Sequence, residues 1–375
     1  MVNPIVRPKS ASGLDIDLGN QCSALAYGWA RRTFDNRRGL AGMPVPGMDG
    51  QFSNVMDFGG VRIAMTSDGI GTKTEIAERT GVYDTLGFDL VAMVVDDLAA
   101  NGIEAVNLTN ILDVDQLETE IVDELMRGLC TAAKVANVTV VGGEIAELGG
   151  RVGGWGRRMH FNWCAAALGM LSVGQDPIDG SSICPGDAVI SLRSRGFRSN
   201  GFSLVRKVLG DVYGPDWHMV GYDDDRTWGQ IALTPSIIYA PLITQLRQRG
   251  FDIHGISHIT GGGIPDKFAR ILRAKGLGAY LPDLFPAHPF MSRLQKMGDI
   301  PEEQAYRLWN MGNGMLVVVN PDSLSTIVRA IGEAGYEARC AGSVVAEPVI
   351  RIVGKGAKPA ELSYDRSPKA QGECR

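Results

Sequence analysis

The stretch "VRIAMTSDGIGTK", residues 61–73, joins an alternating apolar run to a glycine turn that carries an acid and a lysine. The alternation predicts a β-strand, and a glycine turn at a strand end suits phosphate binding. It is not a Walker loop, because the lysine follows a threonine rather than a glycine. An acid for a metal ion, glycines for close backbone approach and a lysine for phosphate charge predict a nucleotide site of another kind. The residues are Asp68, Gly69, Gly71, Thr72 and Lys73.

Composition and charge restrict the class of protein. A chain of 375 residues exceeds one typical core, so we expect two domains. The net charge of -5 gives no case for a nucleic-acid or anionic-membrane partner. No apolar run approaches the roughly 20 residues that a membrane span needs. The cysteines form no CxxC pair, and those in apolar stretches, Cys130 and Cys164, are predicted to be buried thiols. We therefore predict a cytoplasmic protein.

The periodicity predicts an α/β arrangement in each half of the chain. The first half shows strands near 61–68, 106–114, 138–144 and 161–171, with helices over 84–102 and 117–129. The second half repeats this alternation from residue 172, through a tryptophan-containing insertion at 210–233. The predicted divisions are an irregular N-terminal segment (1–55), an N-terminal domain (56–171), a C-terminal α/β domain (172–354) and a disordered tail (355–375).

Three further turns resemble the first in having glycines beside polar side chains. They are "VGGEIAE" (141–147), "RSNG" (198–201) and "TGGGIPDK" (260–267). Each alone could be a plain turn, but four in one chain predict anion binding, and the last opens a helix, whose N-terminus favours negative charge. The candidate residues are Gly142, Gly143, Glu144, Asn200, Gly261, Gly262 and Gly263.

Acidic residues indicate a magnesium site. Asp96 and Asp97 are adjacent within an apolar helical run, and Asp68 precedes the first glycine turn. Mg²⁺ bound with phosphate oxygens would offset the repulsion between such carboxylates. The alternatives are a solvated position for Asp96 and a turn-capping role for Asp68. Glu144 could bind metal, take a proton or cap a turn.

The histidines give weaker signals. None forms an HxH or HxxxH pair, so we do not expect a zinc site. His258 adjoins the last glycine turn and could contact phosphate, whereas His254 is more consistent with a structural role. The candidate catalytic residues are Asp68, Lys73, Asp97 and His258.

Several motifs together resemble the aminoimidazole ribonucleotide synthetase family, also called phosphoribosylformylglycinamidine cyclo-ligases. They occur in the family's order across about residues 12–350. They are "SGLDIDLGN", "SDGIGTK", "YDTLGFDLVAMVVDDLAANG", "VGGEIAE", "SNGFSLVRKVL", "HITGGGIPDKFARIL" and "WNMGNGM". Related ATP-dependent enzymes share the fold and the acid–glycine loop.

The resemblance implies a fold, cofactors and site residues. It implies an N-terminal domain that forms a β-barrel across a homodimer, a C-terminal mixed sheet with flanking helices, and ATP beneath the N-terminal segment. Asp68 and Asp97 match the family's metal-side acids, and Gly69, Gly71, Thr72 and Lys73 match its phosphate loop. Asn200 and Gly201, the second glycine loop at 261–263, and Asn310 match further conserved-looking stretches of the family pattern.

The implied reaction is the ATP-driven ring closure of formylglycinamidine ribonucleotide, a phosphorylated small molecule, with Mg²⁺. The general base stays open among Asp96, Glu144 and His258. Three departures concern the substrate: Arg198 where the family usually has histidine, Asp96 where it has asparagine, and the pair Arg157–Arg158 in "GGWGRRMHFN". These arginines would face phosphate or ribose, or else solvent. The alternative function is a sister ATP-dependent enzyme that phosphorylates another small molecule.

Overall fold

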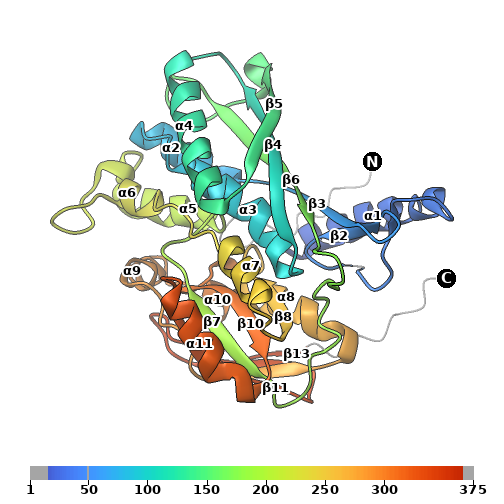
Figure 1. Cartoon of the computed structure of the whole chain (residues 1–375). Helices are drawn as coiled ribbons and strands as arrows, with labels where there is room; N and C mark the ends of the chain where they lie inside the picture. Colours follow the sequence, from blue (N-terminus) through green and yellow to red (C-terminus); the bar gives the residue numbers. More distant parts are fainter. Residues whose placement is uncertain (1–15, 49, 366–375) are drawn as a thin grey trace, which may run out of the picture.

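The computed structural model describes residues 16–48 and 50–365, and it contains two β-sheets with helices packed against them (Figure 1). The first sheet has the order β1-β2-β3-β6-β4-β5 and the second β13-β12-β9-β11-β7-β10-β8. The predicted mixed α/β architecture is confirmed. The first sheet contains β1 (Met43–Pro44), β2 (Asn54–Asp57), β3 (Arg62–Gly69), β4 (Glu104–Val114), β5 (Thr139–Glu147) and β6 (Phe161–Met170).

The second sheet is antiparallel except where β12 pairs with β9. Its strands are β7 (Ala188–Arg193), β8 (Ile253–His258), β9 (Gly278–Leu281), β10 (Asn313–Val319), β11 (Ala338–Val345), β12 (Val349–Val353) and β13 (Glu361–Asp365). β10 lies between β7 and the edge strand β8, and it is buried along its whole length, as its apolar run of methionine, leucine and valine requires.

The helices follow the strands closely in sequence. They are α1 (Ile16–Arg31), α2 (Thr74–Thr80), α3 (Leu86–Ala100), α4 (Thr119–Ala136), α5 (Phe202–Tyr213), α6 (Trp228–Ala232), α7 (Ala240–Gln248), α8 (Gly263–Leu272), α9 (Pro289–Met297), α10 (Glu302–Leu308) and α11 (Leu324–Glu333). Short 3-10 turns link several of them, including η2 (Gly71–Lys73) directly after β3.

Helix α3 is the element that joins the two halves. Its stripe of Leu86, Leu90, Val94 and Leu98 is fully buried, as the fourfold spacing predicts. The helix packs against β3 and β6 of the first sheet and also against α7 and β8 of the second half. Because both halves use this helix, residues near its C-terminal end lie at the junction between them.

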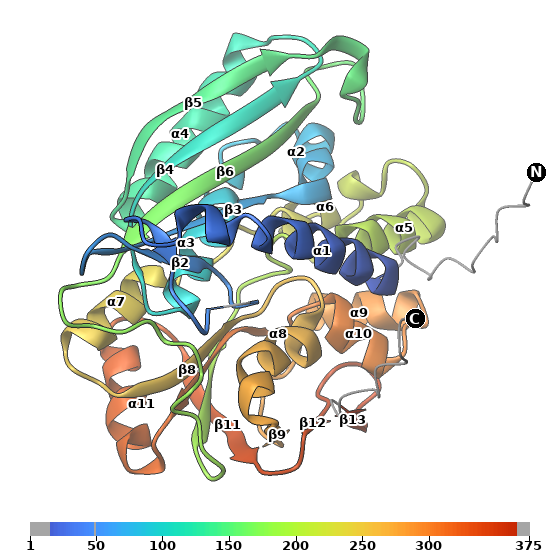
Figure 2. The ribbon, with the colours of Figure 1, turned by 90° about the vertical axis from the view of Figure 1, so that its right-hand side faces the viewer.

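Among the described residues, no helix covers one face of strands β4, β5 and β6. Helices α3 and α4 lie behind β4 and β6, and Figure 2 shows the opposite face open to the viewer. In the described residues this sheet is open rather than a closed barrel, with β1 and β5 at its edges. Exposed apolar side chains on its strands include Met65, Val106, Ile111, Val141, Ile145 and Met170. None of the described helices is long and apolar enough to cross a bilayer.

Three predictions made from the sequence are wrong. The N-terminal segment is not irregular, because residues 16–31 form α1; residues 1–15 lie outside the described part. The tail predicted at 355–375 is ordered as far as Asp365, since β13 pairs with β12, and residues 366–375 again lie outside the description. Cys130 is exposed rather than buried, because it lies on the outer side of the amphipathic helix α4.

Candidate active site

Three of the four glycine turns meet at the junction between the sheets. A Cβ placed on Gly71 would lie 4.0 Å from the Ser199 carbonyl oxygen, and one on Gly261 would lie 3.3 Å from Asn200 Oδ1. Gly263 has a φ of 62°, and a Cβ there would lie 1.8 Å from the Tyr306 carbonyl oxygen. No other residue fits that position, so the turn that opens α8 has to be glycine. The structure thus brings the first glycine turn, the 198–201 turn and the last glycine turn together.

Asp68 and Asp97 face this junction from β3 and α3. Asp68 Oδ1 accepts a hydrogen bond of 2.7 Å from its neighbour's backbone, Gly69 N–H. Burial raises the pKa of Asp68 to about 6, the Gly69 N–H opposes that shift, and the nearby Asp97 adds to it. Burial likewise raises the pKa of Asp97 to about 6 against the attraction of Lys267 and Arg270. A cation bound beside these two buried carboxyl groups would favour their ionised forms. The pair is therefore suited to cation binding.

The donor set at this point fits Mg²⁺ held together with a nucleotide. Among the described residues, His, Cys, Asp and Glu form no cluster of three that could hold a metal ion by themselves. Mg²⁺ is commonly bound by one or two carboxylates, with phosphate oxygens and water completing its shell. Asp68 and Asp97 provide that number, so the residues present fit a phosphate-bound magnesium ion and do not fit a protein-only metal centre.

Unpaired hydrogen-bond donors also point to an anion. The Asn200 side-chain Nδ2 and the Ser199 hydroxyl are buried without a hydrogen-bond partner in the described structure. Buried polar groups are nearly always satisfied, so such a pair in one turn calls for an explanation. A phosphate oxygen would accept from both groups. The predicted position of Asn200 at the site is therefore consistent with its surroundings.

Lys267 on α8 is a site residue that the sequence reading missed. It makes no hydrogen bond or ion pair within the described part of the chain, yet it lies near enough to attract both Asp68 and Asp97. Burial lowers its pKa, helped by Arg270 and opposed by the two acids. A signal was present, because "TGGGIPDK" ends in a lysine just as "DGIGTK" does. Lys267 is therefore a candidate for the positive charge that faces phosphate.

The expectation that Lys73 contacts phosphate is contradicted by its placement. Its side chain is fully buried, with Nζ 2.7 Å from Asp89 Oδ2 and 2.8 Å from the Thr234 carbonyl oxygen. Burial lowers the pKa of Lys73 and raises that of Asp89, and their mutual attraction opposes both shifts. Lys73 begins the turn into α2 and points inward there. The exposed members of this turn are Gly71 and Thr72, which stay candidates for phosphate binding.

Asp96 is not a metal ligand. Its Oδ1 accepts backbone N–H groups from Tyr239 and Ala240 at 2.8 and 2.9 Å, and its Oδ2 accepts from Arg198 at 2.9 Å. With both oxygens occupied and no exposed surface, it can neither bind a metal nor act as the general base. The alternative of a solvated Asp96 is wrong as well, because the second half of the chain covers this face of α3.

His258 lies near the site, but its side chain is fully buried. Its Nδ1 lies 2.7 Å from Asp97 Oδ1 and its Nε2 lies 2.8 Å from an Arg198 nitrogen. Burial, reinforced by Arg198, lowers the pKa of His258 to about 3. A neutral, fully enclosed imidazole with both nitrogens engaged does not fit phosphate contact or general-base catalysis at neutral pH. His254 pairs with Asp187 at 2.7 Å, in keeping with its predicted structural role.

Asn310 is also structural. Its Oδ1 accepts from the Ser194 hydroxyl and the Gly312 N–H, and its Nδ2 donates to the Gly196 carbonyl oxygen. It therefore anchors the strand end beside the 198–201 turn.

The pair Arg157–Arg158 does not face phosphate either. Arg158 pairs at the surface with Glu118 and Glu120, and Arg157 is exposed.

Gly142, Gly143 and Glu144 lie apart from the phosphate turns within one chain. Across the first sheet, Asp68 pairs with Ala165, Ala165 with Asn110 and Asn110 with Gly143. Three strand spacings correspond to about 14 Å along the sheet. All three residues are exposed on the edge strand β5. A contact with the more distant part of a nucleotide stays a prediction.

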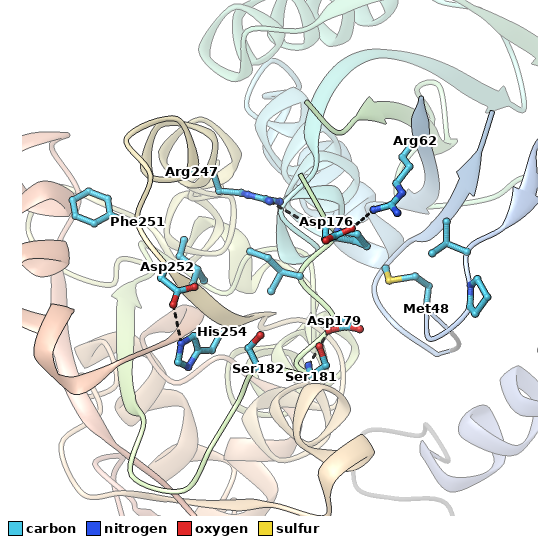
Figure 3. Close-up of a pocket in the computed structure, with 15 residues that line it drawn as sticks. Met48, Arg62, Asp176, Asp179, Ser181, Ser182, Arg247, Phe251, Asp252 and His254 are labelled. Atoms are coloured by element: carbon cyan, nitrogen blue, oxygen red, sulfur yellow. Dashed lines mark hydrogen bonds and ion pairs between the residues drawn. The ribbon is translucent and has the colours of Figure 1, made fainter. Parts of the chain in front are cut away.

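A cavity of about 500 Å³ lies elsewhere, between the connecting segment 176–182 and the ends of β3, α7 and β8 (Figure 3). Both arginines that line it are already engaged by Asp176, which contacts Arg62 through its carboxylate and Arg247 through its carbonyl oxygen (Figure 3). None of the predicted phosphate-site residues lines it. Size alone therefore does not make it the active site.

Solved structures share this fold, and one of them was determined in complex with ATP. The chain aligns with a HypE–HypF complex at a TM-score of 0.59 and 18% identity, over 84% of this chain and 93% of that one. A thiamine-monophosphate kinase from Stenotrophomonas maltophilia gives 0.59 and 15%, over 81% and 90%. The hydrogenase maturation protein HypE in complex with ATP gives 0.55 and 16%, over 80% and 85%. At these identities the likeness establishes the fold alone.

Sequence comparison defines the class and then the family. Residues 50–156 match the N-terminal domain of AIR synthase related proteins, and residues 184–355 match the C-terminal domain. Phosphoribosylformylglycinamidine cyclo-ligase from Thermococcus gammatolerans is 34% identical over 331 residues, covering 88% of this chain and 93% of the relative. The enzyme of that name from Thermococcus kodakarensis is 33% identical over 347 residues, covering 92% and 98%. The chain belongs to the phosphoribosylformylglycinamidine cyclo-ligase family.

Proposed function

We propose that this protein closes the imidazole ring of aminoimidazole ribonucleotide from formylglycinamidine ribonucleotide, with ATP and Mg²⁺, in purine biosynthesis. The formyl amide oxygen attacks the γ-phosphorus of ATP, and the bond to the β-phosphate oxygen breaks to release ADP. The amidine nitrogen then attacks the activated carbon, the carbon–oxygen bond breaks, and inorganic phosphate and a proton leave. The protein contributes positioning and charge stabilisation rather than covalent chemistry.

Each residue of the junction has a role in this proposal. Asp68 and Asp97 hold the magnesium ion, which neutralises phosphate charge when bound. Lys267 adds a positive charge, and Asn200 and Ser199 donate to phosphate oxygens. Gly69, Gly71, Thr72 and the turn 261–263 let backbone N–H groups approach the phosphates. None of the described groups stands out as the general base, since Asp96 and His258 are enclosed.

The observation that carries the proposal is the convergence of three glycine turns and two acids, Asp68 and Asp97, from the two halves of the chain. The acids come from β3 and α3 of the first half, whereas Asn200 and Lys267 come from the second. A junction with glycine turns from both halves of the chain suits two phosphorylated molecules, a nucleotide and a ribonucleotide. Membership of the cyclo-ligase family then selects the substrate from among the ligands that such a site could take.

The reaction is tested by product analysis. With formylglycinamidine ribonucleotide and Mg-ATP, we expect aminoimidazole ribonucleotide, ADP and phosphate in equal amounts, measured by mass spectrometry and a phosphate assay. Omitting the ribonucleotide should abolish phosphate release. A phosphorylated substrate with ADP and no imidazole would favour the sister-kinase alternative, and an absence of ATP consumption would refute the cyclo-ligase proposal.

We further propose that the protein is a cytoplasmic homodimer whose two first sheets face one another to form a β-barrel. One support is the open face of the first sheet (Figure 2). The other is the set of exposed apolar side chains on its strands. Exposed apolar patches of this kind mark interaction surfaces.

The chain would divide near residue 171 into two domains. The segment before residue 55 would lie over the nucleotide, in keeping with the hydrogen bond of Arg270 to the Gln51 carbonyl oxygen and its stacking on Phe52.

The dimer is tested by a charge on the open face. Ile111 is 50% exposed on β4, so we expect Ile111→Lys to desolvate an ammonium group in the interface and yield monomer. Val212, 47% exposed on α5, provides the control, because Val212→Lys should stay dimeric. Sedimentation velocity at micromolar concentration distinguishes a 40.2 kDa chain from twice that mass. A wild-type monomer would rule out the arrangement.

A further inference from the structure

We propose that Arg198 is a positioning residue for Asp97, acting through His258 to fix which oxygen of that carboxylate faces the metal ion. This inference rests on the proposed function, because it takes Asp97 as a magnesium ligand. Four groups are involved: Asp96, Arg198, His258 and Asp97. They form one continuous chain of hydrogen bonds inside the protein, which ends at the candidate active site.

The first step is that Arg198 is held rigidly. Its side chain is 1% exposed, and its guanidinium donates to Asp96 Oδ2 and to the Ile237 carbonyl oxygen, both at 2.9 Å. The same group lies 5.1 Å from the centre of the Tyr239 ring. Asp96 is itself fixed by the two N–H groups at the start of α7. The guanidinium therefore has a single orientation.

The second step fixes the tautomer of His258. A guanidinium carries hydrogen-bond donors and no acceptor, and it does not lose its proton in proteins. The contact of 2.8 Å between an Arg198 nitrogen and His258 Nε2 therefore requires Nε2 to accept. Because a neutral imidazole carries one hydrogen, that hydrogen is on Nδ1.

The third step concerns Asp97, which receives the hydrogen bond from His258. The Nδ1–H of His258 donates to Asp97 Oδ1 at 2.7 Å. The described residues give the other oxygen of Asp97 no hydrogen bond. One oxygen is thus committed to the histidine, and the second is left for the cation. Hydrogen-bond partners behind a ligand often set its orientation, and their loss typically weakens metal affinity about 10–100-fold.

The backbone of Arg198 supports a dedicated role. Its φ is 61°, in the left-handed region that residues with a side chain seldom adopt. Such a conformation persists where the surroundings impose it, and it tends to occur at functional sites. Here the turn that holds the unpaired donors of Ser199 and Asn200 also sends Arg198 inward. One turn thus supplies both phosphate donors and the group that orients the metal-side acid.

The test measures metal binding rather than turnover. Mn²⁺ is titrated into the protein with a non-hydrolysable ATP analogue, and unbound Mn²⁺ is followed by electron paramagnetic resonance. Arg198→Lys keeps the charge that Asp96 needs, but its single nitrogen replaces the two guanidinium nitrogens that reach Ile237 on one side and Asp96 and His258 on the other. We expect its Kd for Mn²⁺ to rise about tenfold. Arg193, which contacts His288 Nδ1 at 3.2 Å outside the site, is the matched control, and Arg193→Lys should keep the wild-type Kd.

A second pair of variants covers the case in which Arg198→Lys fails to fold. His258→Asn retains an N–H donor where Nδ1 lies, whereas His258→Gln places its amide where Nε2 lies. We expect the Asn variant to bind Mn²⁺ several-fold more tightly than the Gln variant. A wild-type Kd in Arg198→Lys, or equal losses in the Asn and Gln variants, would overturn the inference, as would a wild-type protein that binds no Mn²⁺. Mn²⁺ binding by a wild type that forms no imidazole product would instead refute the proposed reaction alone.

Discussion

Replacing Asp68 by asparagine should reduce kcat by at least about a hundredfold while the fold remains intact. The carboxylate would hold the cation that offsets phosphate charge, and such stabilisation is worth several kcal/mol in the transition state. A loss of about 3 kcal/mol corresponds to a little more than two orders of magnitude in rate. Asparagine keeps the size of the side chain and an oxygen that can accept the Gly69 N–H, so stability should change little. Steady-state ADP release measures the effect.

Asp57 on β2 provides the matched control for this experiment. Like Asp68 it lies at the end of a strand and accepts backbone N–H groups, here from Gly59 and Gly60, but it lies outside the junction. Asp57→Asn should retain activity if the turn-capping role is the only one that the two acids share. Mg-ATP should raise the melting temperature of the wild type and of Asp57→Asn, and less that of Asp68→Asn, because stabilisation depends on affinity. Normal turnover in Asp68→Asn would exclude Asp68 from the metal site.

Replacing Lys73 by methionine should cost about 3–5 kcal/mol of stability, because it leaves the fully buried Asp89 carboxylate without its counter-charge. The Ser236 hydroxyl still donates to Asp89 Oδ1, but a neutral hydroxyl does not replace an ammonium group. The measurement is the urea midpoint at one fixed protein concentration, since a dimer's stability depends on concentration.

Two comparisons make the origin of this loss clear. In the double variant Lys73→Met/Asp89→Asn the buried charge is gone, so most of the stability should return. Lys207→Met breaks a solvent-exposed pair with Asp211 and should lower stability far less. If Lys73→Met kept the wild-type urea midpoint but lost its stabilisation by Mg-ATP, Lys73 would face the phosphates as its sequence position suggests, and Lys267 would lose the role assigned to it here.

Patterns that depend on neighbouring residues could be predicted from the sequence. The alternation of 61–68 specifies β3, the fourfold spacing of Leu86, Leu90, Val94 and Leu98 specifies α3, and the glycine turns mark where strands end. Short elements without a clear period, such as β12, β13 and α1, were not predicted. Strand β13 is stable because it pairs with β12, a contact that no local pattern in the tail reveals.

The sequence by itself determined that an acid, glycines and a lysine follow one another at a strand end, a pattern that predicts a phosphate site, and that an acidic pair lies on the following helix. Only the tertiary structure decided which of these side chains face the junction between the two halves. Adjacent residues on a helix point about 100° apart, so Asp97 faces the junction while Asp96 faces Arg198 and α7. Lys73 turns into the core toward Asp89, and Lys267, distant in sequence, occupies the junction near Asp68 and Asp97. Spacing along the chain gives the period of an element, whereas the packing of one half against the other decides the direction in which each side chain is buried.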